Sequence, residues 1–150
     1  MEIIEYVDEI CLGNIPSRGP VFSKRDFCFS DFGVKSVIAH HSFRIMCIQR
    51  GMWCLVDKVW LQQLAIWIGN RTVLEVMAGG GYISKGLAEF GVKIKATDNF
   101  SWGDTHTKIV TVYPIEKISA VAAVKKHKAD ILLVSWPPYD NKIIERVAKV

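Results

Sequence analysis

The chain has 150 residues, of which 50% are hydrophobic and 23% charged, and its formal net charge is +4 at pH 7. This length supports one domain with a substantial core, and the composition excludes an intrinsically disordered chain. No apolar run is long enough to span a bilayer, and the N-terminus lacks the basic-then-apolar order of a signal peptide. We therefore expect a cytoplasmic protein with no membrane partner.

The positive excess lies in the second part of the chain. Lys125, Lys126 and Lys128 stand beside His127 at the end of a predicted helix. Basic side chains are favoured at a helix C-terminus by the helix dipole, so we interpret this cluster as a solvated helix end. By itself the cluster does not indicate a nucleic-acid-binding surface.

The four cysteines have no CxxC spacing and stand among apolar residues; they are Cys11, Cys28, Cys47 and Cys54. We expect reduced, mostly buried thiols and no metal site. Zinc ligation together with His40 and His41 is the alternative, which no ligand spacing supports.

The first part of the chain is predicted to be mainly helical. Helical spacing of apolar residues indicates a helix over residues 2–12. Residues 22–32 are aromatic-rich and fit an extended segment or an irregular lid. Residues 34–49 fit one helix or two strands, and we favour one helix. A further helix is predicted over residues 53–68, with an apolar stripe of Trp53, Val56, Val59, Trp60, Leu64 and Trp67. We interpret residues 1–50 as an accessory or lid segment before a core of residues 51–150.

A strand, a glycine turn and a helix follow. Residues 71–76 read as a short buried strand, Gly79 to Gly81 form the turn, and residues 82–90 resume helical periodicity. Glycines let the backbone pass close to a ligand, and the helix N-terminus offers free N–H groups to it. A second strand over residues 92–97 ends at Asp98, an acid about twenty residues past the turn, which is placed to accept hydrogen bonds from the ribose hydroxyls of an adenosine.

This pattern resembles the first motif of class I S-adenosylmethionine-dependent methyltransferases, which runs apolar-apolar-acid-x-Gly-x-Gly-x-Gly. Met77 stands at the first glycine position, Ala78 is a tolerated small residue, and Gly79 and Gly81 stand where the turn most needs them. The resemblance implies S-adenosylmethionine as cofactor and an α/β, Rossmann-like doubly wound, mainly parallel sheet. It further implies that Glu75 supports the turn and the methionine end of the cofactor.

The same resemblance assigns adenine contacts to the residues after the second strand. Asn99 and Phe100 would wrap the adenine, with Phe100 or Trp102 stacking on the ring, and Glu116 would contact its amino group. Two alternatives remain open. One is a nicotinamide dinucleotide site, because the turn matches part of the glycine motif of such sites, although that motif gives no role to Glu75. The other is a tight turn that binds no ligand.

A second signature follows the fourth predicted strand. We expect a third strand over residues 109–113, a helix over 116–127 and a fourth strand over 130–134. The segment that comes next reads Ser135, Trp136, Pro137, Pro138, Tyr139 and Asp140. It resembles the Asp/Asn/Ser-Pro-Pro-Tyr motif of amino-group methyltransferases, in which a polar side chain and a backbone carbonyl accept hydrogen bonds from the target amine.

The second signature departs from the family at one position. Trp136 stands where the family has its polar residue, so either Ser135 takes that role or the acceptor is not a planar amine. Tyr139 fits the stacking position, the prolines keep the loop rigid, and Asp140 is a candidate for taking a proton from the acceptor.

Only four of the seven strands of such a sheet are predicted. Residues 141–150 begin a helix, and its apolar side would stay uncovered beside the fourth strand. We therefore expect a longer polypeptide, an additional chain or a second copy to complete the sheet. The predicted function is methyl transfer from S-adenosylmethionine to an unidentified acceptor, with a nucleic acid or protein amine favoured. A non-catalytic cofactor-binding scaffold module and an NAD(P)-dependent oxidoreductase are the alternatives.

Overall fold

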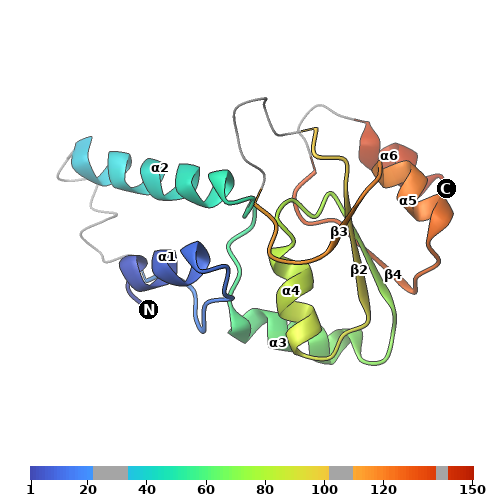
Figure 1. Cartoon of the computed structure of the whole chain (residues 1–150), viewed down its shortest axis with the longest axis horizontal. Coiled ribbons are helices and arrows are strands. Elements are labelled where there is room, and N and C mark those ends of the chain that lie inside the picture. Colours follow the sequence, from blue (N-terminus) through green and yellow to red (C-terminus); the bar gives the residue numbers. More distant parts are fainter. Residues whose placement is uncertain (22–33, 102–109, 138–141) are drawn as a thin grey trace.

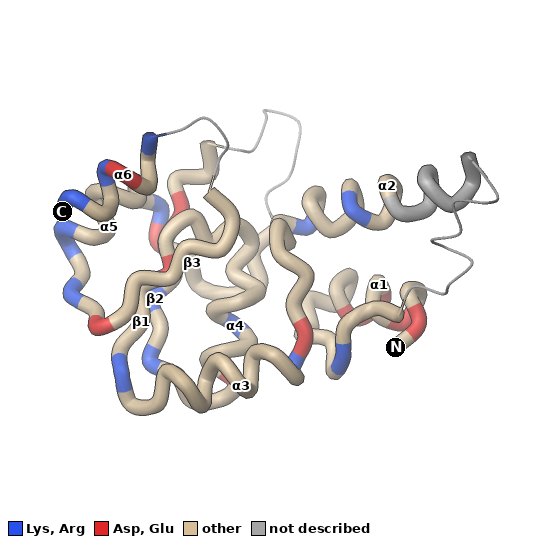
Figure 2. Tube along the Cα trace, turned by 180° about the vertical axis from the view of Figure 1, so that it is seen from behind, with Lys and Arg blue, Asp and Glu red and all other residues tan. Residues whose placement is uncertain are grey.

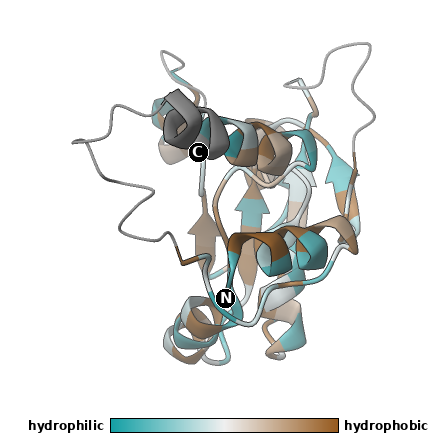
Figure 3. Cartoon of the chain, turned by 90° about the vertical axis from the view of Figure 1, so that its left-hand side faces the viewer, coloured by the Kyte–Doolittle hydropathy of each residue, from teal (hydrophilic) through white to brown (hydrophobic). Residues whose placement is uncertain are grey.

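The protein is an α/β structure built on one parallel sheet (Figure 1). The computed structural model describes residues 1–21, 34–101, 110–137 and 142–150, with backbone alone for residues 34–40. Four strands are described: β1 (Val73–Val76), β2 (Ile94–Asp98), β3 (Ile115–Lys117) and β4 (Ile131–Leu133). They lie in the order β3-β2-β1-β4, and all neighbouring pairs are parallel. The strand arrows accordingly point the same way in Figure 3, and the predicted α/β class with a mainly parallel sheet is confirmed.

Helices cover both faces of this sheet because side chains alternate along each strand. Val73 packs into a core cluster with residues of α3 (Lys58–Ile68) and α4 (Tyr82–Glu89). Leu74 and Val76 point the other way, into a smaller cluster with residues of α5 (Ala120–Lys126) and α6 (Ile143–Ala148). The register pairs Val73 with Ile94 and Leu74 with Lys95, so the same alternation continues into β2.

Helices α1 (Ile3–Cys11) and α2 (Val34–Gln49) stand on the side of the molecule away from α5 and α6 (Figure 1). They nevertheless share the core of the sheet, because Tyr6, Ile10 and Cys47 belong to the same buried cluster as Val73. The Tyr6 hydroxyl donates to the Val56 carbonyl oxygen at 2.8 Å and accepts the Val56 N–H at 3.0 Å. The single helix favoured for residues 34–49 is confirmed.

The helix predicted over residues 53–68 starts later than expected, and its buried face differs. Asp57 caps it by accepting the N–H groups of Val59 at 2.8 Å and Trp60 at 3.1 Å, so the helix begins at Lys58. Its buried residues are Leu61, Ala65 and Ile68. The predicted stripe was wrong at two positions, because Trp67 is 60% and Val59 49% exposed, whereas Val56 is buried and Trp60 and Leu64 pack against the core.

The third strand also lies elsewhere than predicted. Residues 110–113 do not join the sheet, because the Val112 N–H donates to the Gly80 carbonyl oxygen at 2.9 Å and the segment runs over the glycine turn. The strand forms at Ile115–Lys117 instead, and the next helix begins at Ala120, where the Ser119 side chain caps it. Glu116 is therefore a strand residue and not the start of a helix.

The described cysteines are free thiols: Cys47 is buried, Cys54 partly buried and Cys11 exposed. Cys28 lies outside the described residues. Among the described residues no three His, Cys, Asp or Glu side chains gather as a metal site would require. Within those same ranges, every helix is too short or too polar to cross a membrane.

Candidate functional site at the carboxyl ends of β1 and β2

Two bulky residues with left-handed backbone conformation follow adjacent strands. Met77, directly after β1, has φ +58°, and Phe100, two residues after β2, has φ +57°. A side chain in this region costs roughly 1–2 kcal/mol relative to ordinary backbone, and such strain concentrates at functional sites. Met77 stands at the position where the resembled family has glycine, and its φ supplies the physical reason for that preference.

The Asp98 carboxylate hydrogen-bonds to the turn that follows β1 and to the turn that follows β2. Its Oδ2 accepts the N–H of Gly79 at 2.7 Å, and its Oδ1 accepts the N–H of Phe100 at 2.6 Å. The side chain is buried, and hydrogen bonds to a carboxylate contribute about 1.5–3 kcal/mol each. Two such bonds outweigh the strain at Met77 and Phe100, so the carboxylate fixes the relative position of the two turns.

Glu75 lies on the same face of the sheet, fully buried within β1. The Ser84 hydroxyl on the first turn of α4 donates to its Oε2. Its Oε1 has no hydrogen-bond partner among the described residues. Burial raises the pKa of this carboxyl to about 7; the two hydrogen bonds from Ser84 oppose the rise, and the charge of Asp98 adds to it.

The chain's own backbone covers the glycine turn. The Gly80 N–H donates to the Gly51 carbonyl oxygen at 2.8 Å. A Cβ added at Gly79 would lie 2.7 Å from Cδ1 of Trp53, and one added at Gly81 would lie 3.0 Å from Cβ of Tyr113. In this structure, therefore, the space left by the missing glycine side chains is filled by residues of the same chain. Gly51 and Trp53 precede the turn in the sequence, and Tyr113 follows it.

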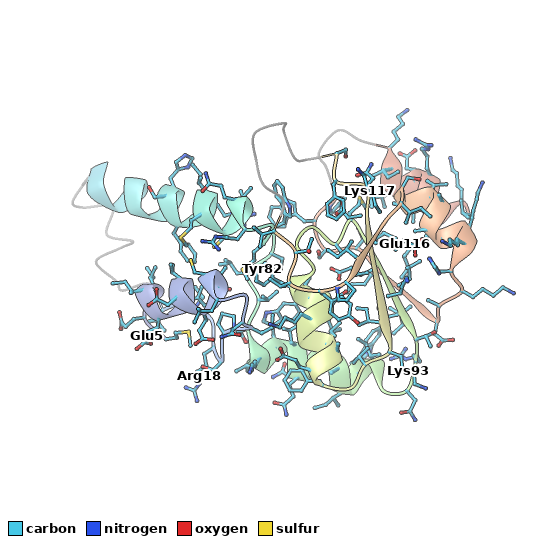
Figure 4. The ribbon with its side chains drawn as sticks, viewed as in Figure 1. Glu5, Arg18, Tyr82, Lys93, Glu116 and Lys117 are labelled. Atoms are coloured by element: carbon cyan, nitrogen blue, oxygen red, sulfur yellow. The ribbon has the colours of Figure 1, made fainter. Side chains whose placement is uncertain are left out.

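A small cavity of about 10 Å³ lies beside the turn, and it brings the two sequence signatures together. Such a volume holds about one water molecule. Its lining residues are Gly51, Met52, Trp53, Cys54, Met77, Ala78, Tyr82, Ile83 and Ser135. Ser135 thus meets two of the predicted cofactor residues, Met77 and Ala78. Tyr82 also donates to the Ile10 carbonyl oxygen at 3.3 Å, which ties α1 to the start of α4 (Figure 4).

Trp136 contacts the N-terminal part of the chain. The Arg44 guanidinium carbon lies 4.9 Å from the centroid of the Trp136 ring, within range of a cation–π contact. The same guanidinium donates to the Trp53 carbonyl oxygen at 2.6 Å. Pro137, the next residue, is half-buried. Trp102, Pro138, Tyr139 and Asp140 lie outside the described residues.

The structure separates Glu116 from this site. In register with Thr97, it points to the face of the sheet opposite to Glu75 and Asp98. Asn99 is exposed beside the site, where its side-chain oxygen accepts the Ser101 N–H at 3.1 Å.

Four residues important to this geometry are missing from the sequence prediction: Arg44, Gly51, Trp53 and Ser84. Ser84 carries a local signal, because a polar residue on the buried face of a predicted helix requires a partner. Gly51 and Trp53 carry none, since their contacts with the turn join segments far apart in the sequence.

No protein-family model, curated protein or solved structure matches this chain.

Proposed function

We propose that this chain carries the cofactor-binding core of a class I S-adenosylmethionine-dependent methyltransferase with a Rossmann-like fold. The observation that carries the proposal is a pair of buried acids on one face of the sheet: Asp98 accepts the N–H of Gly79 in the glycine turn, and Glu75 accepts the Ser84 hydroxyl on the helix that follows it. Left-handed residues close the two adjacent parallel strands that carry these acids. The strand order β3-β2-β1-β4 agrees with it, because ligands of open parallel sheets bind outside the carboxyl ends of the strands.

Each acid has a role in this proposal. Asp98 accepts the ribose hydroxyls of the adenosine, as the resemblance implies. Glu75 places near the start of α4 a buried carboxyl oxygen that has no partner among the described residues, which suits the cationic methionine end of the ligand. S-adenosylmethionine supplies a methyl group on a sulfonium, so the protein has mainly to align the acceptor, which we place near Ser135.

The described cavity is far too small for an adenosyl group. Binding therefore requires that the segment from Gly51 to Cys54 withdraw from the turn. Withdrawal would expose the Gly80 N–H, which Gly51 otherwise accepts.

Calorimetric titration with S-adenosylhomocysteine tests the proposal directly. We expect saturable binding by the wild-type chain and at least tenfold weaker binding by Asp98→Asn. Asp130→Asn is the matched control, because Asp130 also accepts a backbone N–H, from Thr72 at 2.7 Å, outside the turn. Absence of wild-type binding would overturn the proposal, and saturable binding of a nicotinamide dinucleotide instead would favour the oxidoreductase alternative.

A non-catalytic cofactor-binding module is the second candidate. Trp136 favours it, because a polar acceptor is missing at that position and the indole packs against Arg44. Transfer of a radioactive methyl group from S-adenosylmethionine to supplied nucleic acid or protein would exclude this candidate. Binding without transfer to either pool would support it.

A further inference from the structure

A groove of about 440 Å³ opens at the amino ends of β1 and β2, at the end of the sheet opposite to the glycine turn. Its apolar lining residues are Val73, Leu74 and Ile94, and its basic lining residues come from two separate parts of the chain. Lys93 and Lys95 come from the start of β2, and Lys126, His127 and Lys128 from the end of α5. The lysines near residue 126 are therefore more than a solvated helix end, because the fold adds two further lysines to them.

One acid organises part of this groove. Glu116 lies 2.6 Å from Lys126 Nζ, 2.9 Å from His127 Nε2 and 3.4 Å from Lys95 Nζ. Lys126, His127 and Lys95 hold the pKa of Glu116 at about 2, so it carries a full negative charge. Figure 4 shows Glu116 beside α5, and Lys93 near the start of β2.

The remaining lysines leave the groove positive. Lys93 and Lys128 are exposed and form no ion pair with any residue that the structure describes. Figure 2 shows the basic positions along the side of the molecule formed by α5 and the starts of β1 and β2. The carboxylates of Glu116 and Asp130 contact residues of the groove, and against these two the four lysines leave an excess of positive charge along it.

The arrangement fits a chain of phosphates better than a single phosphate group. Lysine is a flexible point charge without the bidentate geometry of arginine, and Glu116 repels a compact anion bound beside Lys95 and Lys126. A polyanion gains from charges that are spread out, because each neutralised phosphate releases counterions. Val73 and Leu74 are buried, so the groove offers little apolar surface to a lipid membrane, and its exposed basic side chains suit a nucleotide strand better.

We propose that this groove binds the phosphodiester backbone of a nucleic acid. The proposal is independent of the cofactor site, which lies at the other end of the strands. With two lysines outside any described ion pair and two that pair with Glu116, we expect the logarithm of the binding constant to fall with the logarithm of salt concentration with a slope of about −2 to −3.

Fluorescence anisotropy with a labelled oligonucleotide, single-stranded or duplex, measures this slope for the full chain. Lys93→Gln combined with Lys128→Gln should weaken binding at least about tenfold at low salt and reduce the slope by about 1.5. Arg18→Gln combined with Lys58→Gln removes the same charge from the loop and helix on the other face of the sheet and should change neither value. Glu116→Gln should tighten binding, because it removes the opposing charge. Since the two groove lysines form no described ion pair, the unfolding midpoint of the first variant should match that of the wild type.

Three results would overturn the proposal. Equal losses in the two double variants would show that only net charge matters. Competition by inorganic tripolyphosphate as effective as that by the oligonucleotide would indicate a small-phosphate site. Binding to phosphatidylserine vesicles without oligonucleotide binding would assign the groove to a membrane surface.

Discussion

Replacement of Glu75 by glutamine should change how stability depends on pH. In the folded chain the pKa of Glu75 is about 7, against an ordinary value of 4.5. This difference corresponds to about 3 kcal/mol, since each pH unit contributes about 1.4 kcal/mol. Because the folded protein holds this proton more tightly, the stabilisation is fully present below pH 4.5 and is lost as the pH rises through about 7.

Glutamine is neutral throughout this range and keeps an oxygen that can accept the Ser84 hydroxyl. Its amide N–H groups add a cost of about 1–3 kcal/mol that does not vary with pH. The free energy of unfolding of Glu75→Gln, relative to wild type, should therefore rise by about 3 kcal/mol between pH 4.5 and about pH 8. Urea denaturation followed by tryptophan fluorescence measures it, and Glu89→Gln, which removes an exposed carboxylate from α4, is the matched control.

A pH-independent difference between Glu75→Gln and wild type would refute this reasoning. It would mean that the Glu75 carboxyl is solvated or paired in solution, contrary to its complete burial and its unpartnered Oε1. The curve also tests the site, because a charge that the fold tolerates only at a cost is one that a cationic ligand would stabilise.

Substitutions at Gly79, Met77 and Tyr6 test the packing around the site, each by the free energy of unfolding in urea. Gly79→Ala should cost about 2–4 kcal/mol, because its Cβ meets an indole carbon at 2.7 Å, whereas Gly91→Ala, also at positive φ but with nothing within 4 Å, should cost only about 1 kcal/mol. Met77→Val should be less stable than Met77→Gly by about 1–2 kcal/mol, and the opposite order would contradict the left-handed backbone at this position. Tyr6→Phe should cost about 1–3 kcal/mol, because the buried N–H and C=O groups of Val56 lose their partner; an unchanged stability would show that water replaces the hydroxyl.

The elements with strong local signals were predictable from the sequence. The run from Val73 to Glu89 combines an apolar strand, three glycines and a helical periodicity, and the structure has β1, the turn and α4 there. Asp98 was correctly placed at the end of β2, and the expected parallel pairing of the strands is confirmed. These features depend on residues within one or two elements, where secondary-structure propensity and the spacing of apolar residues are enough to predict the element.

The contacts that shape the site depend on distant segments. The cover that Gly51 and Val112 form over Gly80 joins three stretches of chain, and no local pattern encodes it. The third strand was misplaced for the same reason. The segment before Tyr113 forms its backbone hydrogen bond with Gly80 of the glycine turn, through the Val112 N–H, and does not pair with a strand of the sheet. Asp57 shows a different failure: its capping signal was present in the sequence, but the apolar stripe was given priority over it.

Asp98 raises a question that a double substitution can resolve. Its two hydrogen bonds fix the turns at Gly79 and Phe100, so Asp98→Asn can weaken cofactor binding by loosening the turn rather than by losing a direct contact. Glycine at position 77 adopts the left-handed conformation without strain, so it reduces the energy that Asp98 has to supply. If Asp98 acts through the turn, adding Met77→Gly to Asp98→Asn should restore much of the affinity for S-adenosylhomocysteine. If Asp98 contacts the ribose, the two effects should add without rescue, as they do for independent interactions.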